Sequence, residues 1–198
     1  MKGQLNLTFK NGIVSGSAVE GATLSNAATW LLEAINNPDI KVNLDTVDGL
    51  YYYDSNTKNY VYFEGDAFRG SFTYNEKVTA TNIVSPSVIE AIDNLTKSNK
   101  GTTMLHAALE AYIGGKYFPN SMFTVGKDGT FGKNDLPYVI SHDWATCLDP
   151  TNMRDLPSTY RFKSRPIYEN FIMKSDTPYI FDKSTSIILH QFETFKYR

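Results

Sequence analysis

The spacing of apolar residues changes twice along this chain, and that change limits the possible folds more than any other feature. Apolar residues recur at helical spacing from Leu24 to Ile35, alternate with polar residues in short runs between Ile40 and Asn82, and return to helical spacing after Ser85. A group of strands flanked by helices is typical of α+β proteins. We therefore expect an α+β fold, with a small, mostly antiparallel sheet, three to four helices and additional strands near the C-terminus.

Capping residues and helix breakers mark the ends of the four expected helices. The third runs from about Thr102 to Ile113 and ends at Gly114-Gly115, a pair typical of a left-handed helix end. Pro137 lies in the first turn of the fourth, a position that tolerates proline. The other caps and breakers are Thr23 or Ser25 and Asn37-Pro38 for the first helix, Ser85-Pro86 for the second, and Asn134 or Asp135 for the fourth.

Short alternating runs predict the strands. Those beyond Tyr160 either join the first sheet or form a small one of their own, and the aromatic tail from Phe192 to Arg198 is either a docked edge strand or a contact for another subunit. We expect one domain spanning 1–198, with a core at about 24–150 and a β extension at about 158–198. The three or four earlier strands, expected to be antiparallel, are Ile40 to Leu44, Tyr60 to Phe63, Phe68 to Tyr74 and Val78 to Asn82.

Charge, hydropathy and cysteine content argue against several classes of partner. The 19 basic and 21 acidic residues nearly cancel, which does not favour nucleic acid or anionic lipid, and the alternating cations Arg161, Lys163 and Arg165 predict a solvated strand face. Neither a signal peptide nor a membrane-spanning run is expected. Cys147 is the single cysteine, so no intrachain disulfide can form, and we expect it to be a small buried residue in a protein of a reducing interior or of a particle assembled there.

Histidine and glutamate on two of the helices form a candidate metal site. His106 and Glu110 stand four residues apart on the third helix and share a face, and His142 is available from the fourth. Two histidines and one glutamate can hold zinc and leave a position open for water. The alternative is a His106–Glu110 hydrogen bond at the rim of a packed helix. His190 is expected to be a partly buried strand histidine, not a ligand.

The run His106-x-x-x-Glu110-Ala111-Tyr112-x-Gly114, followed by His142-x-x-Ala145, resembles the compact zincin-type metallopeptidase domains of Bacteroidetes polymorphic toxins and phages. In those domains the helix reads H-E-x-x-E-A-Y-x-G, and a later helix supplies a histidine followed by an alanine three positions on. The resemblance covers about residues 40 to 150. It implies a small sheet ahead of the helix, with zinc held by His106, Glu110 and His142.

Ala107 departs from this family pattern, because it occupies the position of the glutamate that acts as the general base. Proton transfer by such a group contributes about 100-fold to 10,000-fold in rate, and alanine cannot provide it. Asp143 is a candidate substitute that the sequence does not place at the site. The resemblance therefore supports the fold more than the activity.

Two functions follow as expectations. The first is a non-catalytic structural or assembly protein on a degenerate zincin-like fold: a tailed-phage virion component in an oligomeric assembly with other protein subunits, located in the host cytoplasm or the virion. It has no catalytic residue, and its cofactor is either none or zinc. The alternative is a zinc-dependent metallopeptidase that uses the same three ligands and an unusual general base.

Overall fold

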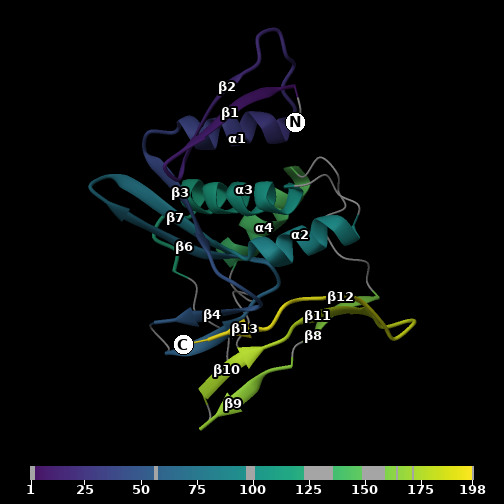
Figure 1. The fold of residues 1–198 in the computed structure, drawn as a ribbon. Coiled ribbons are helices and arrows are strands. Elements are labelled where there is room, and N and C mark those ends of the chain that lie inside the picture. Colours follow the sequence, from purple (N-terminus) through teal and green to yellow (C-terminus); the bar gives the residue numbers. More distant parts are fainter. Residues whose placement is uncertain are drawn as a thin grey trace.

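The computed structural model of the chain describes residues 3–55, 58–96, 101–122, 136–148, 159–163, 165–170 and 172–197. Across these ranges the protein is α+β, with four helices and thirteen strands arranged in small, mostly antiparallel sheets (Figure 1). The expected fold class is confirmed. None of the helices in these ranges combines the length and the apolar character that crossing a bilayer requires.

The central sheet contains one parallel strand pair, so the expectation of antiparallel pairing is wrong in part. Its order is β3 (Ile40–Thr46), β7 (Lys77–Val84), β6 (Asp66–Tyr74). A tight turn through Asn75 and Glu76, both with positive φ, returns β7 antiparallel to β6, while β7 runs parallel to β3. Side chains alternate between faces in both kinds of pairing, so alternation predicts a strand but not its direction.

Helix α3 (Thr102–Tyr117) crosses this sheet and is enclosed by other elements. Figure 1 shows it at the centre of the upper half, with α4 (Leu136–Leu148) beside it, and α1 (Asn26–Asn36) and α2 (Pro86–Leu95) on either side. Ala107 and Ala111 pack toward the sheet, whereas Leu109 and Ile113 share a cluster with residues of α1 and α4. Because these neighbours cover most of its surface, most of α3 is buried.

Two glycines allow α3 to approach the sheet closely. A Cβ atom at Gly114 would lie 2.0 Å from a ring carbon of Phe68, and one at Gly115 would lie 2.8 Å from the Cβ of Ala80. The expected helix end at this pair is wrong, because α3 continues to Tyr117. Glycine is required here for lack of space and not for a left-handed backbone.

The beginning of α3 is capped by a side chain from α2. Residue 101 is a glycine and offers no capping side chain, but the Oδ2 of Asp93 accepts a hydrogen bond from the Gly101 N–H at 2.7 Å. The Oδ1 of Asp93 accepts from the Thr103 hydroxyl at 2.7 Å. The carboxylate therefore satisfies donors at the helix N-terminus and fixes α2 against α3.

The ends of the other helices follow the capping signals where these are described. The Ser25 hydroxyl accepts from the Ala28 N–H at 3.3 Å, α1 ends before Asn37, and α2 begins at Pro86. These expected ends are confirmed. The expected caps of α4, Asn134 and Asp135, lie outside the described residues.

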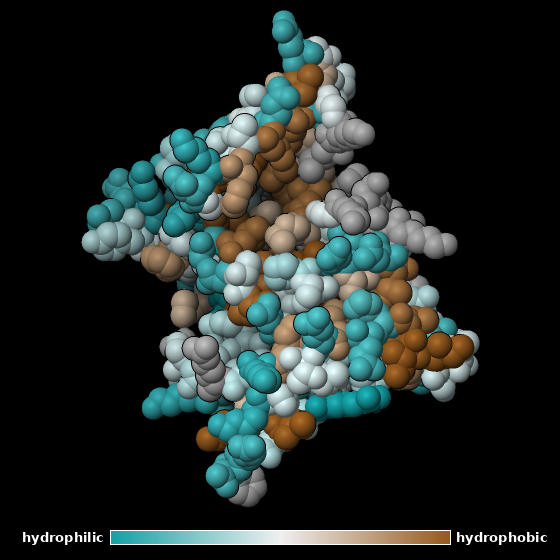
Figure 2. All heavy atoms as spheres, in the orientation of Figure 1, coloured by the Kyte–Doolittle hydropathy of each residue, from teal (hydrophilic) through white to brown (hydrophobic). Residues whose placement is uncertain are grey.

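An N-terminal hairpin was not expected from the sequence. It consists of β1 (Leu5–Lys10) and β2 (Ile13–Ala18), joined by Asn11-Gly12 with positive φ at both residues. Asn-Gly between two runs of alternating polarity is nevertheless a strong sequence signal for a two-residue hairpin turn. The hairpin packs on α1, yet Phe9 is 75% exposed. Figure 2 shows hydrophobic side chains along this part of the surface.

The C-terminal strands do not join the central sheet but form two small sheets of their own. The orders are β12-β11-β8 and β13-β10-β9. Pairing of β13 with β10 makes the tail a docked edge strand, as expected. The strands are β8 (Tyr160–Lys163), β9 (Ile167–Glu169), β10 (Ile172–Asp176), β11 (Tyr179–Asp182), β12 (Ile187–Gln191) and β13 (Phe195–Lys196).

These sheets share a hydrophobic cluster with α2 and with a second hairpin, β4 (Tyr51–Asp54) and β5 (Asn59–Tyr62). Ile180 and Phe192 are buried in this cluster together with Val88 of α2. The Tyr197 ring lies edge-on to Tyr60, with 4.9 Å between ring centroids. Residues near the C-terminus therefore cover a hairpin that lies early in the chain.

We expect Gly114→Ala to lower the free energy of unfolding by about 1 to 3 kcal/mol, because the added methyl group overlaps the Phe68 ring and α3 must move away from the sheet. Urea denaturation measures this change. The matched control is Gly16→Ala, whose Cβ would crowd the end of the flexible Leu7 side chain and otherwise make ordinary contacts, and its effect should stay below about 0.5 kcal/mol. Equal effects of the two substitutions would contradict the close-packing argument.

Candidate metal site

The structure brings together the three residues that the sequence analysis selected as ligands. His106, Glu110 and His142 each direct a potential ligand atom so that all three atoms lie within 4.8 Å of one another. The first two come from adjacent turns of α3, and the third comes from α4. Helical spacing brings His106 and Glu110 together, whereas packing of α4 against α3 brings in His142. The spacing alone does not predict that packing.

Both ligands of α3 are deeply buried, which corrects the alternative of a pair at the helix rim. His106 and Glu110 are each only 1% exposed, whereas the His142 side chain is 32% exposed. Glu110 faces β7, and α4 covers it from the other side. The site is thus closed toward the core and reaches solvent on the His142 side.

The two oxygen atoms of the Glu110 carboxylate differ in their surroundings, because among the described residues only Oε2 has a hydrogen-bond partner, while Oε1 is buried beside His142 without one. Oε2 accepts a hydrogen bond from the Nδ2 of Asn82 at 2.9 Å, and Oε1 lies 3.3 Å from the Nδ1 of His142. A buried carboxylate is costly unless it is hydrogen-bonded and paired with a positive charge. A protonated His142 can supply that charge, and a divalent cation can supply it in its place.

Aromatic contacts orient the His142 ring. Its centroid lies 5.0 Å from that of His106 in an edge-to-face arrangement, and 5.9 Å from that of Tyr138, whose ring is nearly parallel to it. Tyr138 precedes His142 by one helical turn and packs against the cluster of Phe68 and Ala111. Packing of Tyr138 against the core therefore restricts where His142 can point.

The donor set fits a transition metal ion such as zinc. Zinc bonds of about 2.0 to 2.2 Å to nitrogen and oxygen place tetrahedral ligand atoms roughly 3.3 Å apart. The distance from Glu110 Oε1 to His142 Nδ1 is 3.3 Å, and the complete set spans at most 4.8 Å, so small side-chain rotations would close it around an ion. Two imidazoles and a carboxylate suit zinc better than calcium or magnesium, which prefer oxygen ligands.

Neither position 107 nor Asp143 provides a proton acceptor at this site. Ala107 is 0% exposed and packs against Val84 and Ile89, away from solvent. Asp143 is exposed, whereas the positions of α4 that pack inward are Ser141 and Ala145. One residue along a helix turns the side chain by about 100 degrees, so Asp143 lies outside the face that carries His142.

Asn82 is a site residue that the sequence analysis did not identify as such. It lies on β7, two positions after Ala80 and two before Val84, on the sheet face that α3 covers. A polar side chain in register with buried apolar ones signals a buried partner. That signal was available, because the alternation of Val78, Ala80 and Asn82 is visible in the sequence.

Other predicted features lie elsewhere on the molecule. His190 is exposed on β12, so the expectation of partial burial is wrong, and it is not among the three residues whose potential ligand atoms converge. Cys147 is also exposed, because it is two positions from the inward-facing Ala145 on α4 and therefore faces the other way. Arg161 and Lys163 are exposed on β8, as expected for a solvated strand face, whereas Arg165 is exposed but lies outside the strand.

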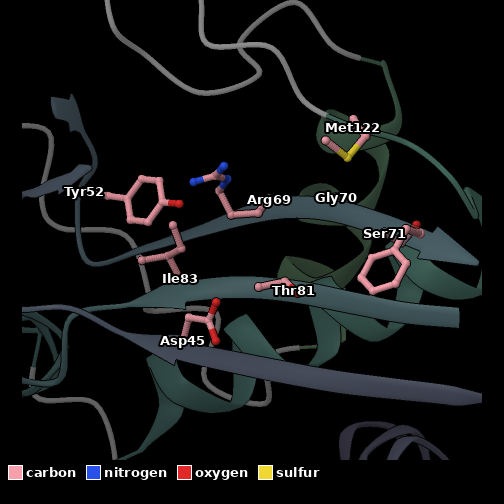
Figure 3. A pocket seen from close by; sticks show the side chains of 9 residues that line it. Asp45, Tyr52, Arg69, Gly70, Ser71, Thr81, Ile83 and Met122 are labelled. Carbon is pink, nitrogen blue, oxygen red and sulfur yellow. The ribbon is translucent and has the colours of Figure 1, made fainter. Parts of the chain in front are cut away.

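A separate pocket of about 180 Å³ lies on the opposite side of the central sheet. Figure 3 shows its lining side chains in front of the strands, with helix behind them. Thr81 and Ile83 line it, and they alternate with Ala80 and Asn82 on the face beneath α3. The sheet therefore separates this pocket from the candidate metal site.

Comparisons of the chain with protein-family models, with curated protein sequences and with solved structures give no match. The chemical reading of the site therefore depends on the residues themselves and on the geometry described above.

We expect one Zn²⁺ to bind per chain in isothermal titration calorimetry. At 100 times the dissociation constant the ion should stabilise the fold by about 2.7 kcal/mol and raise the melting temperature by roughly 5 to 10 °C. His106→Ala, Glu110→Gln and His142→Ala should each abolish saturable binding. His190→Ala is the matched control and should bind as the wild type does, since His190 lies apart from the cluster. Equal loss in the control would contradict the assignment.

Proposed function

We propose that the protein is a non-catalytic structural and assembly protein, built on a zincin-like frame, in which a zinc ion joins α3 to α4. The site's donor set supports metal binding, since His106, Glu110 and His142 converge and Glu110 is already held from behind. The resemblance adds the proposed setting, a component of a tailed-phage particle. In this role the ion acts as a crosslink between helices and not as a Lewis acid for a substrate.

The observation that carries the proposal is the environment of Ala107. This residue stands where a zincin has its general base, and it is fully buried against Val84 and Ile89. A metal-bound water needs a nearby group to take its proton at a useful rate. The apolar packing around Ala107 supports a structural role for this position in the core and not a catalytic role.

Exposed apolar surface supports a role in assembly. The N-terminal hairpin presents Leu7, Phe9, Ile13 and Val14 at the surface, and the hydrophobic area continues on the face seen in Figure 2. Exposed apolar patches of this kind commonly mark sites where other proteins bind. We therefore assign the hairpin to contacts with other subunits.

The second candidate function is a zinc-dependent metallopeptidase that uses the same ligands. It is favoured by the three-ligand set, which leaves a coordination position for water, and by the exposure of His142, which places that side of the site near solvent. It requires a proton acceptor other than the residue at position 107.

A peptidase assay separates these two functions. The zinc-loaded wild type and His106→Ala are incubated with a diverse peptide library, and cleavage is followed by mass spectrometry. We expect no cleavage above the His106→Ala background. Zinc-dependent cleavage that a chelator stops and His106→Ala lacks would establish the peptidase and overturn the structural proposal.

We further expect Ala107→Glu to fail to create peptidase activity. A carboxylate at this position must enter the contact with Val84 and Ile89, which should cost several kcal/mol of folding free energy and lower the melting temperature sharply. Ala108→Glu is the matched control, because Ala108 is only partly buried on the same helix and should tolerate the change better. A stable, active Ala107→Glu protein would show that the position still faces the metal.

A further inference from the structure

We propose that Asn82 is a positioning residue that restricts Glu110 to binding metal through one oxygen atom, and that it thereby favours zinc over calcium and magnesium. This inference rests on the proposed metal site. It assigns a role in choosing the ion to a neutral strand residue that contacts Glu110 from β7.

Asn82 makes three hydrogen bonds from a fully buried position. Its Nδ2 donates to Glu110 Oε2 at 2.9 Å and to the Ala107 carbonyl oxygen at 3.1 Å. Its Oδ1 accepts from the Ala67 N–H at 2.9 Å. The side chain is 0% exposed, so water cannot replace any of these partners. Contacts with β6 and α3 therefore fix the direction in which the amide group points.

This fixed amide assigns different tasks to the two oxygens of Glu110. Oε2 is directed toward β7 by Asn82, while Oε1 is directed toward His142. Binding an ion between α3 and α4 through both oxygens would turn Oε2 away from β7 and weaken its hydrogen bond with Asn82. That movement would leave one N–H of a buried amide poorly paired, which is unfavourable. One-oxygen binding through Oε1 keeps every partner in place.

The number of available oxygens decides which ions fit. Zinc is satisfied by four ligands, and one carboxylate oxygen with two imidazoles leaves one position for water. Calcium takes six to eight oxygens and commonly uses a carboxylate through both of its oxygens, and magnesium requires an octahedral oxygen shell. Holding Glu110 to one oxygen withholds a ligand that the larger shells need.

Hydrogen bonds that hold a metal-binding side chain in place typically contribute about 10-fold to 100-fold to metal affinity. We therefore expect Asn82→Ala to weaken zinc binding by about 10-fold to 100-fold, and to reduce the preference for zinc over calcium by at least about tenfold. Calorimetric titrations with Zn²⁺ and Ca²⁺ measure both quantities. The matched control is Asn43→Ala, which removes an asparagine that hydrogen-bonds the exposed Asp45 on β3.

Cobalt spectroscopy distinguishes positioning from a merely structural contribution. The visible absorption of bound Co²⁺ reports its coordination number, and we expect a tetrahedral spectrum in the wild type and in Asn43→Ala. Asn82→Ala should shift toward a higher-coordinate spectrum, because Glu110 is then free to bind through both oxygens. Loss of stability alone would lower the melting temperature of the metal-free protein and leave this spectrum unchanged.

The wild type provides a second test that does not depend on whether Asn82→Ala folds. X-ray absorption of the zinc-loaded protein should give one carboxylate oxygen in the first shell. Two carboxylate oxygens, or an unchanged cobalt spectrum and zinc affinity in folded Asn82→Ala, would overturn the role of Asn82 while leaving the metal site intact. Absence of saturable zinc binding in the wild type would instead overturn the proposed metal function itself.

Discussion

Burial of most of α3 is the constraint on which the rest of the structure depends. A helix with a broad solvent face can leave its polar groups to water, but Glu110 and the N-terminus of α3 need partners inside the protein. Asn82 and Asp93 supply such partners from β7 and α2. Each buried polar residue on one element therefore requires a matching residue on another, and these pairs fix the positions of the helices relative to the sheet.

The same constraint explains why the candidate metal site is well defined geometrically. The ligands are oriented by contacts that also hold the core together, since Tyr138 packs on the core while it orients His142, and Asn82 joins β6 to α3 while it holds Glu110. Ala107 belongs to the same packing through Val84 and Ile89. The contacts that orient the ligands are therefore also contacts on which the packing of the core depends.

Sequence patterns predicted the parts of the fold that depend on neighbouring residues. Ser25 and Pro86 marked helix starts correctly, and the spacing of His106 and Glu110 placed them on one face. The patterns were insufficient where distant segments decide. The parallel pairing of β3 with β7, the continuation of α3 past Gly114 and the exposure of Cys147 all result from packing partners far away in the chain. Two other features do have local signals in the sequence: Asn82 alternates with apolar residues of a strand, and Asn11-Gly12 is typical of a hairpin turn.

The contact between Tyr197 and the β4–β5 hairpin has a consequence for the order of folding. That hairpin pairs locally, but a two-stranded hairpin alone is only marginally stable. Helix α2 follows it closely in the chain, whereas its other covering partners, from β8 to Tyr197, are separated from it by much of the chain. Closing so large a loop is entropically costly and slow compared with pairing of adjacent segments. The half of the protein around α3, whose contacts span shorter separations, can therefore assemble first. The two C-terminal sheets then pack against the β4–β5 hairpin.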